Sequence, residues 1–370
     1  MTRPLTIAYV IGGLPFGGVE NWLFDLARAL RADPDVHARI LNVSGTGVKM
    51  DDFRAEGLEV LCAGDSKKAL KTGNLKTLRR VRAILREVRP DIVHTLQFSG
   101  DYFGRLGAWG LGAPVITHIR NVKSERHLRR RVINRLLSFR TDLYLSVSKA
   151  AVATIQREHN LARRPVQVLY NAVDPAKLAV PPVDFAARHG LRGPVVLGVG
   201  RLVAQKNFDL LLRAVRLLLD RGQEVSACLV GDGGERERLE GLAAELGLGG
   251  RVAFAGYVPN AEVPGYLRAA AVLCMPSDYE GLPVTHVEAL FCGLPAVISD
   301  RVPSAEIAGA ASLICRREPA DIADRLAALL GDPARRAEFS AAALAIAPEY
   351  AMDRYVERLK AVYRGLVSGS

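Results

Sequence analysis

The sequence has few cysteines, few aromatic residues and no long apolar run. No stretch of 18 apolar residues occurs, so we expect no membrane-spanning helix. The opening MTRPLTIAYVIGG enters a strand pattern without the apolar core of a signal peptide, so no leader is expected. The five cysteines are scattered in apolar surroundings without CxxC spacing. This pattern argues against a zinc or disulfide framework and predicts buried thiols in a cytosolic protein.

The GxGxxG fingerprint of nicotinamide-dependent enzymes is also missing after the first strand pattern. The chain instead reads GGLPFGGVE, which places Gly17 and Gly18 directly before a helix pattern. Glycines at this position let backbone amides approach a phosphate, and a merely flexible loop is the alternative. The one Asp-x-Asp element, Asp33-Pro34-Asp35, follows a helix pattern and is interpreted as a turn. We therefore predict neither a metal site nor a metal cofactor.

Strand and helix patterns alternate along the whole chain, and its 370 residues are long for a single core. This alternation predicts an α/β protein with two doubly wound, Rossmann-like domains, in which ligands sit beyond the carboxyl ends of parallel strands. A proline-containing segment at about 171–192 separates the two series of patterns. We expect domains at 1–178 and 179–349, followed by an amphipathic helix over 350–370.

Positive charge is concentrated in the first half of the chain. Residues 1–180 hold 29 Lys and Arg against 16 Asp and Glu, a net charge of +13, whereas residues 181–370 hold 21 against 23, a net of −2. Two stretches carry most of the excess: residues 67–89 contain nine basic side chains and one acid, and residues 120–140 contain eight and one. The charge therefore belongs to the first domain.

The second basic stretch also has an amphipathic helix pattern, with five apolar residues at helical spacing. They are Leu128, Val132, Ile133, Leu136 and Leu137. A solvated helix face packed on the sheet is one interpretation, and docking on anionic lipid headgroups is the other. Nucleic acid is the weakest alternative, because neither a recognition motif nor interleaved aromatic residues accompany the charge.

The segment SDYEGLPVTHVEALFCGLPAV carries two glutamates, Glu280 and Glu288, with seven residues between them across a loop-to-helix junction. Pro283 suits the start of a helix and Gly293 its end, so a helix of about ten residues is expected between them. Glu288 lies one turn from apolar residues on that helix, and we expect its carboxylate to be largely buried. The amino-terminal end of a helix attracts anions, and carboxylates accept hydrogen bonds from vicinal hydroxyls. The pair therefore indicates a nucleotide-sugar site. An ion pair with a distant arginine is the alternative.

Arg201 and Lys206 lie in GVGRLVAQK, between a strand pattern and a helix pattern. A guanidinium offers a forked pair of donors and an ammonium a mobile point charge. Together these two cations could neutralise a departing diphosphate without a metal.

Polar side chains also end two strand patterns of the first domain. His94 ends DIVH, and His118 with Arg120 ends APVITHIRN. Such positions face ligands in doubly wound sheets, although a single histidine is often structural.

Taken together, these segments resemble the retaining glycosyltransferases of family 4, which have the GT-B fold of two Rossmann-like domains facing across a cleft. The resemblance covers essentially the whole chain. It is carried by GGVE (17–20), NAVD (171–174), GRLVAQK (200–206), GDG (231–233), EGLPVTHVE (280–288) and GLP (293–295).

The resemblance implies a role for each matching residue of the second domain. Glu280 would contact the donor sugar and Glu288 the nucleotide ribose, and the EGLP segment through Gly281, Leu282 and Pro283 would meet the sugar or its phosphate. Arg201 and Lys206 would hold the diphosphate. Leu282 and Pro283 depart from the family pattern, which often has Gly-Phe-Gly after the first glutamate.

In the first domain the resemblance implies that the glycine loop contacts the donor and that a histidine contacts the donor sugar. The family's T-x-H element does not align cleanly. His118 fills the histidine position in one register, and Arg120 fills it in a shifted register. The final helix would return to the first domain.

These observations predict a retaining glycosyltransferase that moves a sugar from a nucleoside diphosphate sugar to an acceptor hydroxyl. The basic first domain favours a lipid-linked or membrane-associated glycan acceptor, as in surface polysaccharide synthesis, and a location in the cytoplasm or at the inner face of the plasma membrane. The alternatives are a nucleotide-sugar epimerase of the same fold and a non-catalytic nucleotide-sugar-binding subunit. No nucleic-acid partner is expected.

Overall fold

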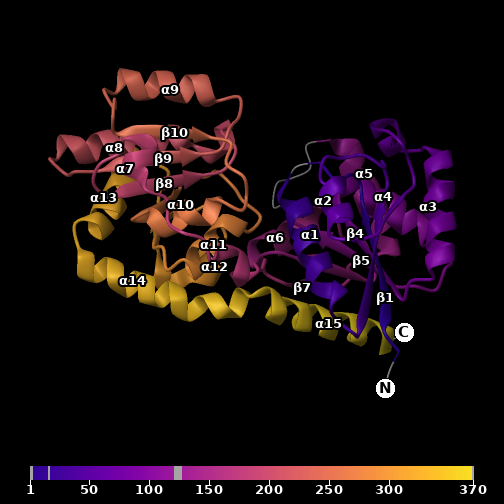
Figure 1. The fold of residues 1–370 in the computed structure, drawn as a ribbon. Coiled ribbons are helices and arrows are strands. Elements are labelled where there is room, and N and C mark those ends of the chain that lie inside the picture. Colours follow the sequence, from indigo (N-terminus) through magenta and orange to yellow (C-terminus); the bar gives the residue numbers. More distant parts are fainter. Residues whose placement is uncertain (1–2, 16, 121–126, 369–370) are drawn as a thin grey trace. The chain divides into compact units, whose positions relative to one another are not determined.

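The computed structural model describes residues 3–15, 17–120 and 127–368, and the chain forms two compact units (Figure 1). The first unit comprises Met1–Tyr170 and Met352–Ser370, and the second comprises Asn171–Ala351. Each unit is built on a parallel sheet of its own. The predicted pair of Rossmann-like domains is confirmed.

The first unit contains a seven-stranded sheet in the order β3-β2-β1-β4-β5-β6-β7, in which every neighbouring pair is parallel. Its strands are β1 (Leu5–Ile11), β2 (Val36–Asn42), β3 (Val60–Cys62), β4 (Ile92–Leu96), β5 (Val115–Ile119), β6 (Leu143–Ser146) and β7 (Val166–Val168). Its helices are α1 (Gly18–Arg31), α2 (Met50–Ala55), α3 (Leu75–Val88), α4 (Gln97–Gly107), α5 (Leu128–Leu137), α6 (Lys149–Glu158) and α15 (Met352–Ser368). The strand order reverses between β1 and β4, which makes the carboxyl ends of these strands a binding position.

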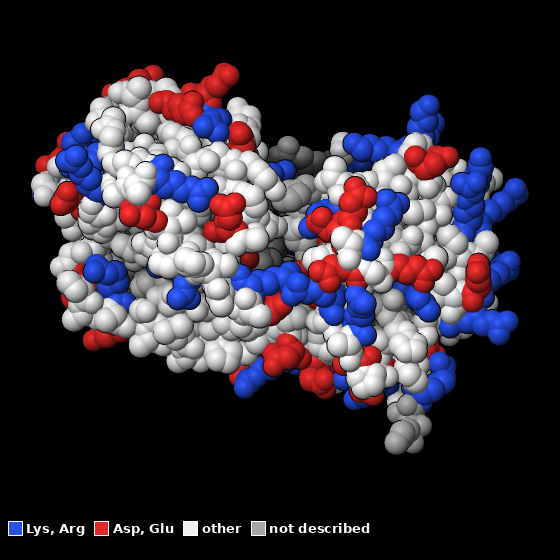
Figure 2. Space-filling model, viewed as in Figure 1, with Lys and Arg blue, Asp and Glu red and all other residues white. Residues whose placement is uncertain are grey.

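Both faces of this sheet are covered by helices because its central strands β1, β4 and β5 are largely buried on both sides. On one face, Val10 and Val93 belong to a core cluster with Val81 of α3 and Phe103 of α4. On the other face, Tyr9 of β1 meets α15. Outside the core, Lys and Arg side chains gather along the edge of the unit formed by α3 (Figure 2).

The final helix α15 is fastened to the first unit by charge and by hydrogen bonds. Lys360 is 7% exposed, and its Nζ lies 2.8 Å from Asp33 Oδ2 and 3.0 Å from Asp35 Oδ2. The Tyr363 hydroxyl lies 2.7 Å from the Tyr9 hydroxyl, and both are buried. Asp33 and Asp35 lie in the predicted turn between α1 and β2, and the structure shows that they also bind the last helix.

The second unit contains a six-stranded parallel sheet in the order β10-β9-β8-β11-β12-β13. Its strands are β8 (Val195–Val199), β9 (Ser226–Val230), β10 (Val252–Gly256), β11 (Val272–Met275), β12 (Ala296–Ser299) and β13 (Ser312–Cys315). Its helices are α7 (Phe185–His189), α8 (Phe208–Asp220), α9 (Arg236–Glu245), α10 (Val263–Ala269), α11 (Val284–Phe291), α12 (Ala305–Ala308), α13 (Pro319–Leu330) and α14 (Pro333–Ile346). Residues of α8, α9 and α13 fill one core cluster of this unit, and residues of α7, α10 and α11 fill the other.

Residues 171–178, which we expected in the first domain, group with the second unit. The Asn171 side chain donates from Nδ2 to the Leu282 carbonyl over 2.6 Å, and the amide of Val173 donates to the Tyr350 carbonyl. The boundary therefore precedes NAVD, because these contacts, which the local sequence does not reveal, hold the segment to residues more than 100 positions away.

Two other expectations concern the cysteines and membrane-spanning helices. Cys62 is exposed, contrary to the prediction of buried thiols, because β3 is the outermost strand on its side of the sheet. Among the described helices, none combines the length and the apolar character needed to cross a membrane.

Candidate active site

The candidate site of the second unit lies where its strand order reverses, at the carboxyl ends of β8 and β11. These strands are neighbours in the sheet, and β9 lies on the other side of β8. The loop after β8 contains Arg201 and a short 3₁₀ turn, Ala204–Lys206, and the loop after β11 contains Glu280. Parallel strands end at one edge of the sheet, so these side chains come together there.

Lys206 and Glu280 are in direct contact at this edge. Lys206 Nζ lies 2.6 Å from Glu280 Oε1, and the two side chains are 16% and 14% exposed. Two of the predicted site residues, 74 positions apart, therefore form one charge pair at the reversal point.

Backbone and side-chain hydrogen bonds join the same two loops. The Asp278 amide donates to the Gln205 carbonyl over 2.9 Å, and Gln205 Nε2 donates to the Tyr279 carbonyl over 2.7 Å. Asn207, which precedes α8 with a left-handed φ of 49°, donates from Nδ2 to Asp278 Oδ1 over 2.8 Å. These hydrogen bonds fix the two loops relative to each other and so keep the Lys206 ammonium next to the Glu280 carboxylate.

Glycines let the loop after β9 pass directly against the loop after β8. Gly231 has a φ of +135°, and a Cβ added to it would lie 2.0 Å from the Gly200 carbonyl oxygen. The Leu202 amide donates to the Asp232 carbonyl over 2.9 Å. The GDG segment thus supports the loop that carries Arg201, whose side chain is exposed.

Helix α11 begins at Val284 rather than at Pro283, which is its N-cap with extended backbone (φ −64°, ψ 121°). The helix has eight residues, and Gly293 follows it with a φ of 62°, as expected for a helix end. Leu282 is buried and Gly281 half-buried, so the EGLP segment forms a fixed entrance to the helix.

Glu288 is intermediate in burial, so its side chain is partly rather than completely enclosed. The fully buried face of α11 consists of His286, Val287, Ala289 and Leu290. Glu288 lies on the outer face with Val284, which is itself half-buried. Its charge contributes to the raised pKa of Cys292, about 11, although burial of the thiol is the main cause.

In the first unit, the glycine loop leads into α1 at the carboxyl end of β1. Gly17 is the N-cap of α1, and Gly18 is its first residue. A Cβ on Gly17 would lie 2.4 Å from Glu20 Oε2, whereas a Cβ on Gly18 would meet nothing within 4 Å. The glycine at position 17 therefore makes room for the Glu20 carboxylate.

His118 and His94 lie inside the first unit in a chain of hydrogen bonds. The Tyr363 hydroxyl lies 2.8 Å from His94 Nδ1, and His94 Nε2 lies 3.2 Å from His118 Nδ1. His118 is 1% exposed, and its Nε2 finds no hydrogen-bond partner among the described residues. Burial lowers the pKa of both imidazoles, and His94 reaches about 3.

Arg120 is half-buried and lies closer to the surface than His118. Its guanidinium carbon lies 3.8 Å from the ring centroid of Trp22. Burial lowers the pKa of Arg120 to about 10, while Tyr355 and Glu20 act in the opposite direction. Of the two candidates for the histidine position, Arg120 is partly exposed as a residue, although its Nη1 is buried.

The sequence interpretation gave no role to Glu20 or to Gln97. Glu20 is 4% exposed, and burial raises its pKa. Gln97 follows β4 with a left-handed φ of 62° and donates from Nε2 to Glu20 Oε1. A non-glycine residue in this conformation is costly and is typical of functional sites. Glu20 belongs to the GGVE motif and could have been noticed in the sequence, whereas no sequence signal indicates the left-handed backbone of Gln97.

Acidification should destabilise the second unit through His286 of α11. This imidazole is fully buried beside the Ser312 hydroxyl, and burial lowers its pKa to about 4. An unfolded histidine takes up a proton near pH 6.5, so stability is complete above that pH and falls by about 1.4 kcal/mol per pH unit below it. Calorimetry between pH 7 and pH 5 should show a falling melting temperature.

The His286→Gln variant should show a weaker pH dependence of that transition, whereas His37→Gln, at an exposed position, should behave as the parent protein. A transition of the second unit that does not move between these pH values would contradict the prediction. The first unit is less suitable for this test, because burial raises the pKa of Asp101 to about 6 and this acts in the opposite direction.

Two family models match consecutive parts of the chain. The model described as glycosyltransferase family 4 matches residues 16–177, and the model described as glycosyl transferases group 1 matches residues 184–345. Their junction lies close to the boundary between the two units.

Curated relatives match part of the chain. A 2-deoxystreptamine glucosyltransferase of Streptomyces kanamyceticus is 35% identical over 156 residues, which are 40% of each chain. A D-inositol 3-phosphate glycosyltransferase of Catenulispora acidiphila is 33% identical over 187 residues, which are 47% of this chain and 45% of that protein. The chain thus spans less than half the length of these relatives.

Solved structures match the fold over nearly the whole chain. Anabaena Alr3699/HepE in complex with UDP has a TM-score of 0.85 at 22% identity and covers 98% of this chain and 100% of its own. Sucrose-phosphate synthase from Thermosynechococcus elongatus has a TM-score of 0.82 at 20% identity, with coverage of 99% and 100%. With the two family models and the paired parallel sheets, these similarities identify the chain as a family 4 glycosyltransferase with the GT-B fold.

Proposed function

We propose that this glycosyltransferase transfers a sugar from a nucleoside diphosphate sugar to an acceptor hydroxyl with retention of configuration. The contact between Lys206 and Glu280 is the observation that carries the proposal. It brings an ammonium and a carboxylate together at the reversal point of a doubly wound sheet, which supports a phosphate contact beside a sugar contact.

Lys206 and Arg201 would hold the diphosphate of the donor, and Glu280 would hold the sugar. When the bond between the anomeric carbon and the phosphate oxygen breaks, negative charge develops on the departing phosphate. The two cations stabilise that charge without a metal. The new bond forms from the acceptor oxygen on the same face of the sugar, and the acceptor proton passes to the departing phosphate.

Glu288 would bind the ribose of the donor. Its carboxylate is half-buried on the outer face of α11 and thus remains accessible to a ligand. The backbone of Gly281 and Leu282 would approach the sugar or its phosphate. Pro283 fixes the entrance to the helix.

In the first unit, we propose that Arg120 and the loop at Gly17 and Gly18 contact a ligand at the carboxyl ends of the strands. Glu20 lies next to them and orients Gln97. The His118 side chain, which is 1% exposed, would need to move before it could touch a substrate.

The acceptor is proposed to be a lipid-linked or membrane-associated glycan, as in surface polysaccharide synthesis, reached by a peripheral contact with anionic membrane. The net charge of +13 on residues 1–180 supports this choice. Undiminished binding to anionic vesicles after Arg129, Arg130 and Arg131 are changed to Glu would count against the basic helix as the contact.

Thermal stabilisation by a panel of sugar nucleotides tests the donor. A ligand at 100 times its dissociation constant adds about 2.7 kcal/mol of stability, so the correct nucleotide and sugar stand out from the panel.

Incubation of that donor with a membrane extract should then release a nucleoside diphosphate and label a glycan. A new sugar nucleotide formed without acceptor would identify an epimerase instead, and binding without turnover a non-catalytic subunit.

A further inference from the structure

Helix α5 exposes apolar side chains that an amphipathic helix would normally bury. Leu128, Val132 and Leu136 are 65%, 45% and 59% exposed. They recur every four residues and therefore lie on one side of the helix. Much of the apolar stripe seen in the sequence faces solvent.

The most buried residue of α5 is polar: Asn134 lies between the half-buried Ile133 and Leu137 and is held in place by Arg105 of α4. Arg105 is fully buried and donates from Nη2 to Asn134 Oδ1 over 2.9 Å, and from Nη1 to the Asn134 carbonyl. Ser138, which follows the helix, is buried and accepts from the Ala162 amide. Turning the helix to bury its leucines would leave the Arg105 guanidinium without these partners, which is costly. The outward direction of the stripe is thus fixed.

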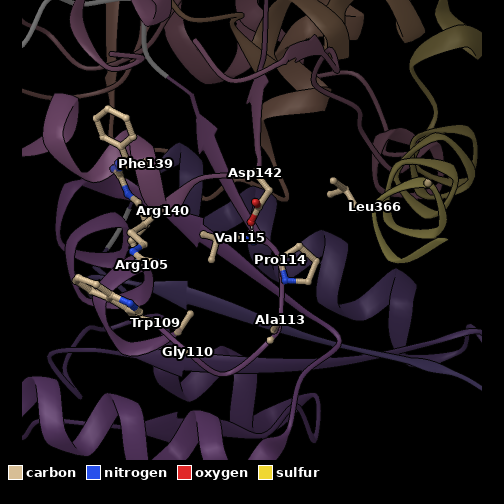
Figure 3. A pocket seen from close by; sticks show the side chains of 13 residues that line it. Arg105, Trp109, Gly110, Ala113, Pro114, Val115, Phe139, Arg140, Asp142 and Leu366 are labelled. Atoms are coloured by element: carbon tan, nitrogen blue, oxygen red, sulfur yellow. Dashed lines mark hydrogen bonds between the residues drawn. The ribbon is translucent and has the colours of Figure 1, made fainter. Parts of the chain in front are cut away.

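Two aromatic side chains extend the exposed apolar surface beyond the helix. Phe139 is 57% exposed and Trp109 is 53% exposed, and the Arg140 guanidinium lies 3.6 Å from the ring centroid of Trp109. Both aromatic residues line a pocket of about 440 Å³, in which Phe139, Arg140 and Trp109 lie in a row on one side (Figure 3). We call Leu128, Val132, Leu136, Phe139 and Trp109 the docking surface.

The end of the docking surface formed by Phe139 and Trp109 is separate from the candidate active site, whereas Leu128 begins α5 on the side of Arg120. The pocket is also lined by Val115, the first residue of β5, and by Asp142, which precedes β6. It therefore opens at the amino-terminal edge of the sheet, whereas the candidate ligand-binding residues of this unit lie at the carboxyl edge.

Positive side chains lie on the same helix as the exposed leucines. Arg129 and Arg131 are exposed, and Arg130 is held 4.7 Å from the ring centroid of Phe98. Apolar residues on one side of a helix and arginines beside them match the boundary between lipid headgroups and acyl chains. The exposed arginines beside the stripe favour an anionic bilayer over an uncharged protein surface.

We propose that the docking surface inserts into the headgroup region of an anionic lipid bilayer, with α5 lying parallel to the membrane. The ten residues of α5 span about 15 Å, so the three aliphatic side chains can enter together. The flanking arginines then reach lipid phosphates. This inference extends the membrane contact in the proposed function, but it requires no transferase activity.

Flotation with vesicles tests the insertion. The parent chain should float with vesicles of equal parts phosphatidylglycerol and phosphatidylcholine, and poorly with phosphatidylcholine alone. Changing Leu128, Val132 and Leu136 together to Gln should reduce binding by about tenfold or more, because apolar burial is lost. Leu344→Gln in the second unit, at a residue that is 51% exposed, is the matched control and should bind as the parent does.

Tryptophan fluorescence provides a second readout of insertion. Trp109 is exposed and Trp22, the other tryptophan, is 3% exposed, so a blue shift on vesicle addition that Trp109→Phe abolishes would report insertion at the docking surface. Undiminished vesicle binding by the triple variant would overturn the inference. So would a variant that loses self-association while it still binds vesicles, since the surface would then bind a second copy of the chain. Neither result depends on whether sugar transfer is detected.

Discussion

Replacing Glu280 with alanine is expected to lower sugar transfer on the order of 10²-fold or more. The side chain is proposed to hold the donor sugar, and it also holds the Lys206 ammonium 2.6 Å away. Its loss removes a sugar contact and frees the cation that faces the departing phosphate. The pair is only 14–16% exposed but lies at a loop edge, so we expect a stability loss of about 1 kcal/mol. Initial rates of nucleoside diphosphate release would measure the effect.

Glu262→Ala is the matched control for this variant. Glu262 belongs to the same unit and forms an ion pair with Arg188 at 3.1 Å, but both side chains are about half exposed. Because the pair is solvated and includes no residue of the candidate site, its loss should leave transfer unchanged. Full activity of Glu280→Ala, with a normal melting temperature, would refute the assignment of Glu280.

Gly231→Ala is expected to destabilise the second unit by about 3 kcal/mol or more and to abolish donor binding. The new Cβ would lie 2.0 Å from the Gly200 carbonyl oxygen, and the backbone has a φ of +135°. Strain and overpacking add, since neither backbone can yield without moving the loop that carries Arg201 and Lys206. The melting temperature of this unit should fall by roughly 10 °C.

Gly234→Ala provides the comparison within the same loop. A Cβ at position 234 meets nothing within 4 Å, and its φ lies outside the left-handed region. Such a substitution is neutral or slightly stabilising, because it restricts the unfolded chain. Equal melting temperatures for the two variants would show that the loops are not in the close contact described.

The sequence was sufficient to predict the fold and the loops that form the candidate site. Alternating patterns specify parallel sheets, and polar residues after strand patterns then fall at one edge. Lys206 and Glu280 were predicted separately as a phosphate contact and a sugar contact. Their mutual contact depends on β8 and β11 being neighbours in the sheet, and this strand order cannot be predicted from local sequence patterns.

Features that depend on long-range packing could not be predicted. Helical spacing suggested a buried apolar stripe on α5. The buried Arg105 instead donates a hydrogen bond to Asn134, which turns Asn134 inward and leaves much of the stripe in solvent. The partial burial of Glu288 depends on which face of α11 meets the core, and the spacing of apolar residues does not determine that face. The left-handed Gln97 is a consequence of the join between β4 and α4, and glutamine gives no sign of it.

Titration of the protein with nucleoside diphosphates, in the presence of a chelator, tests the central claim most directly. We predict saturable binding with one site per chain for at least one diphosphate, at least tenfold weaker in Lys206→Ala and in Arg201→Ala. A tenfold loss corresponds to about 1.4 kcal/mol, which is within the range for one charge-assisted contact. Binding that is equally tight in both variants, or that appears only when a metal is supplied, would contradict the account.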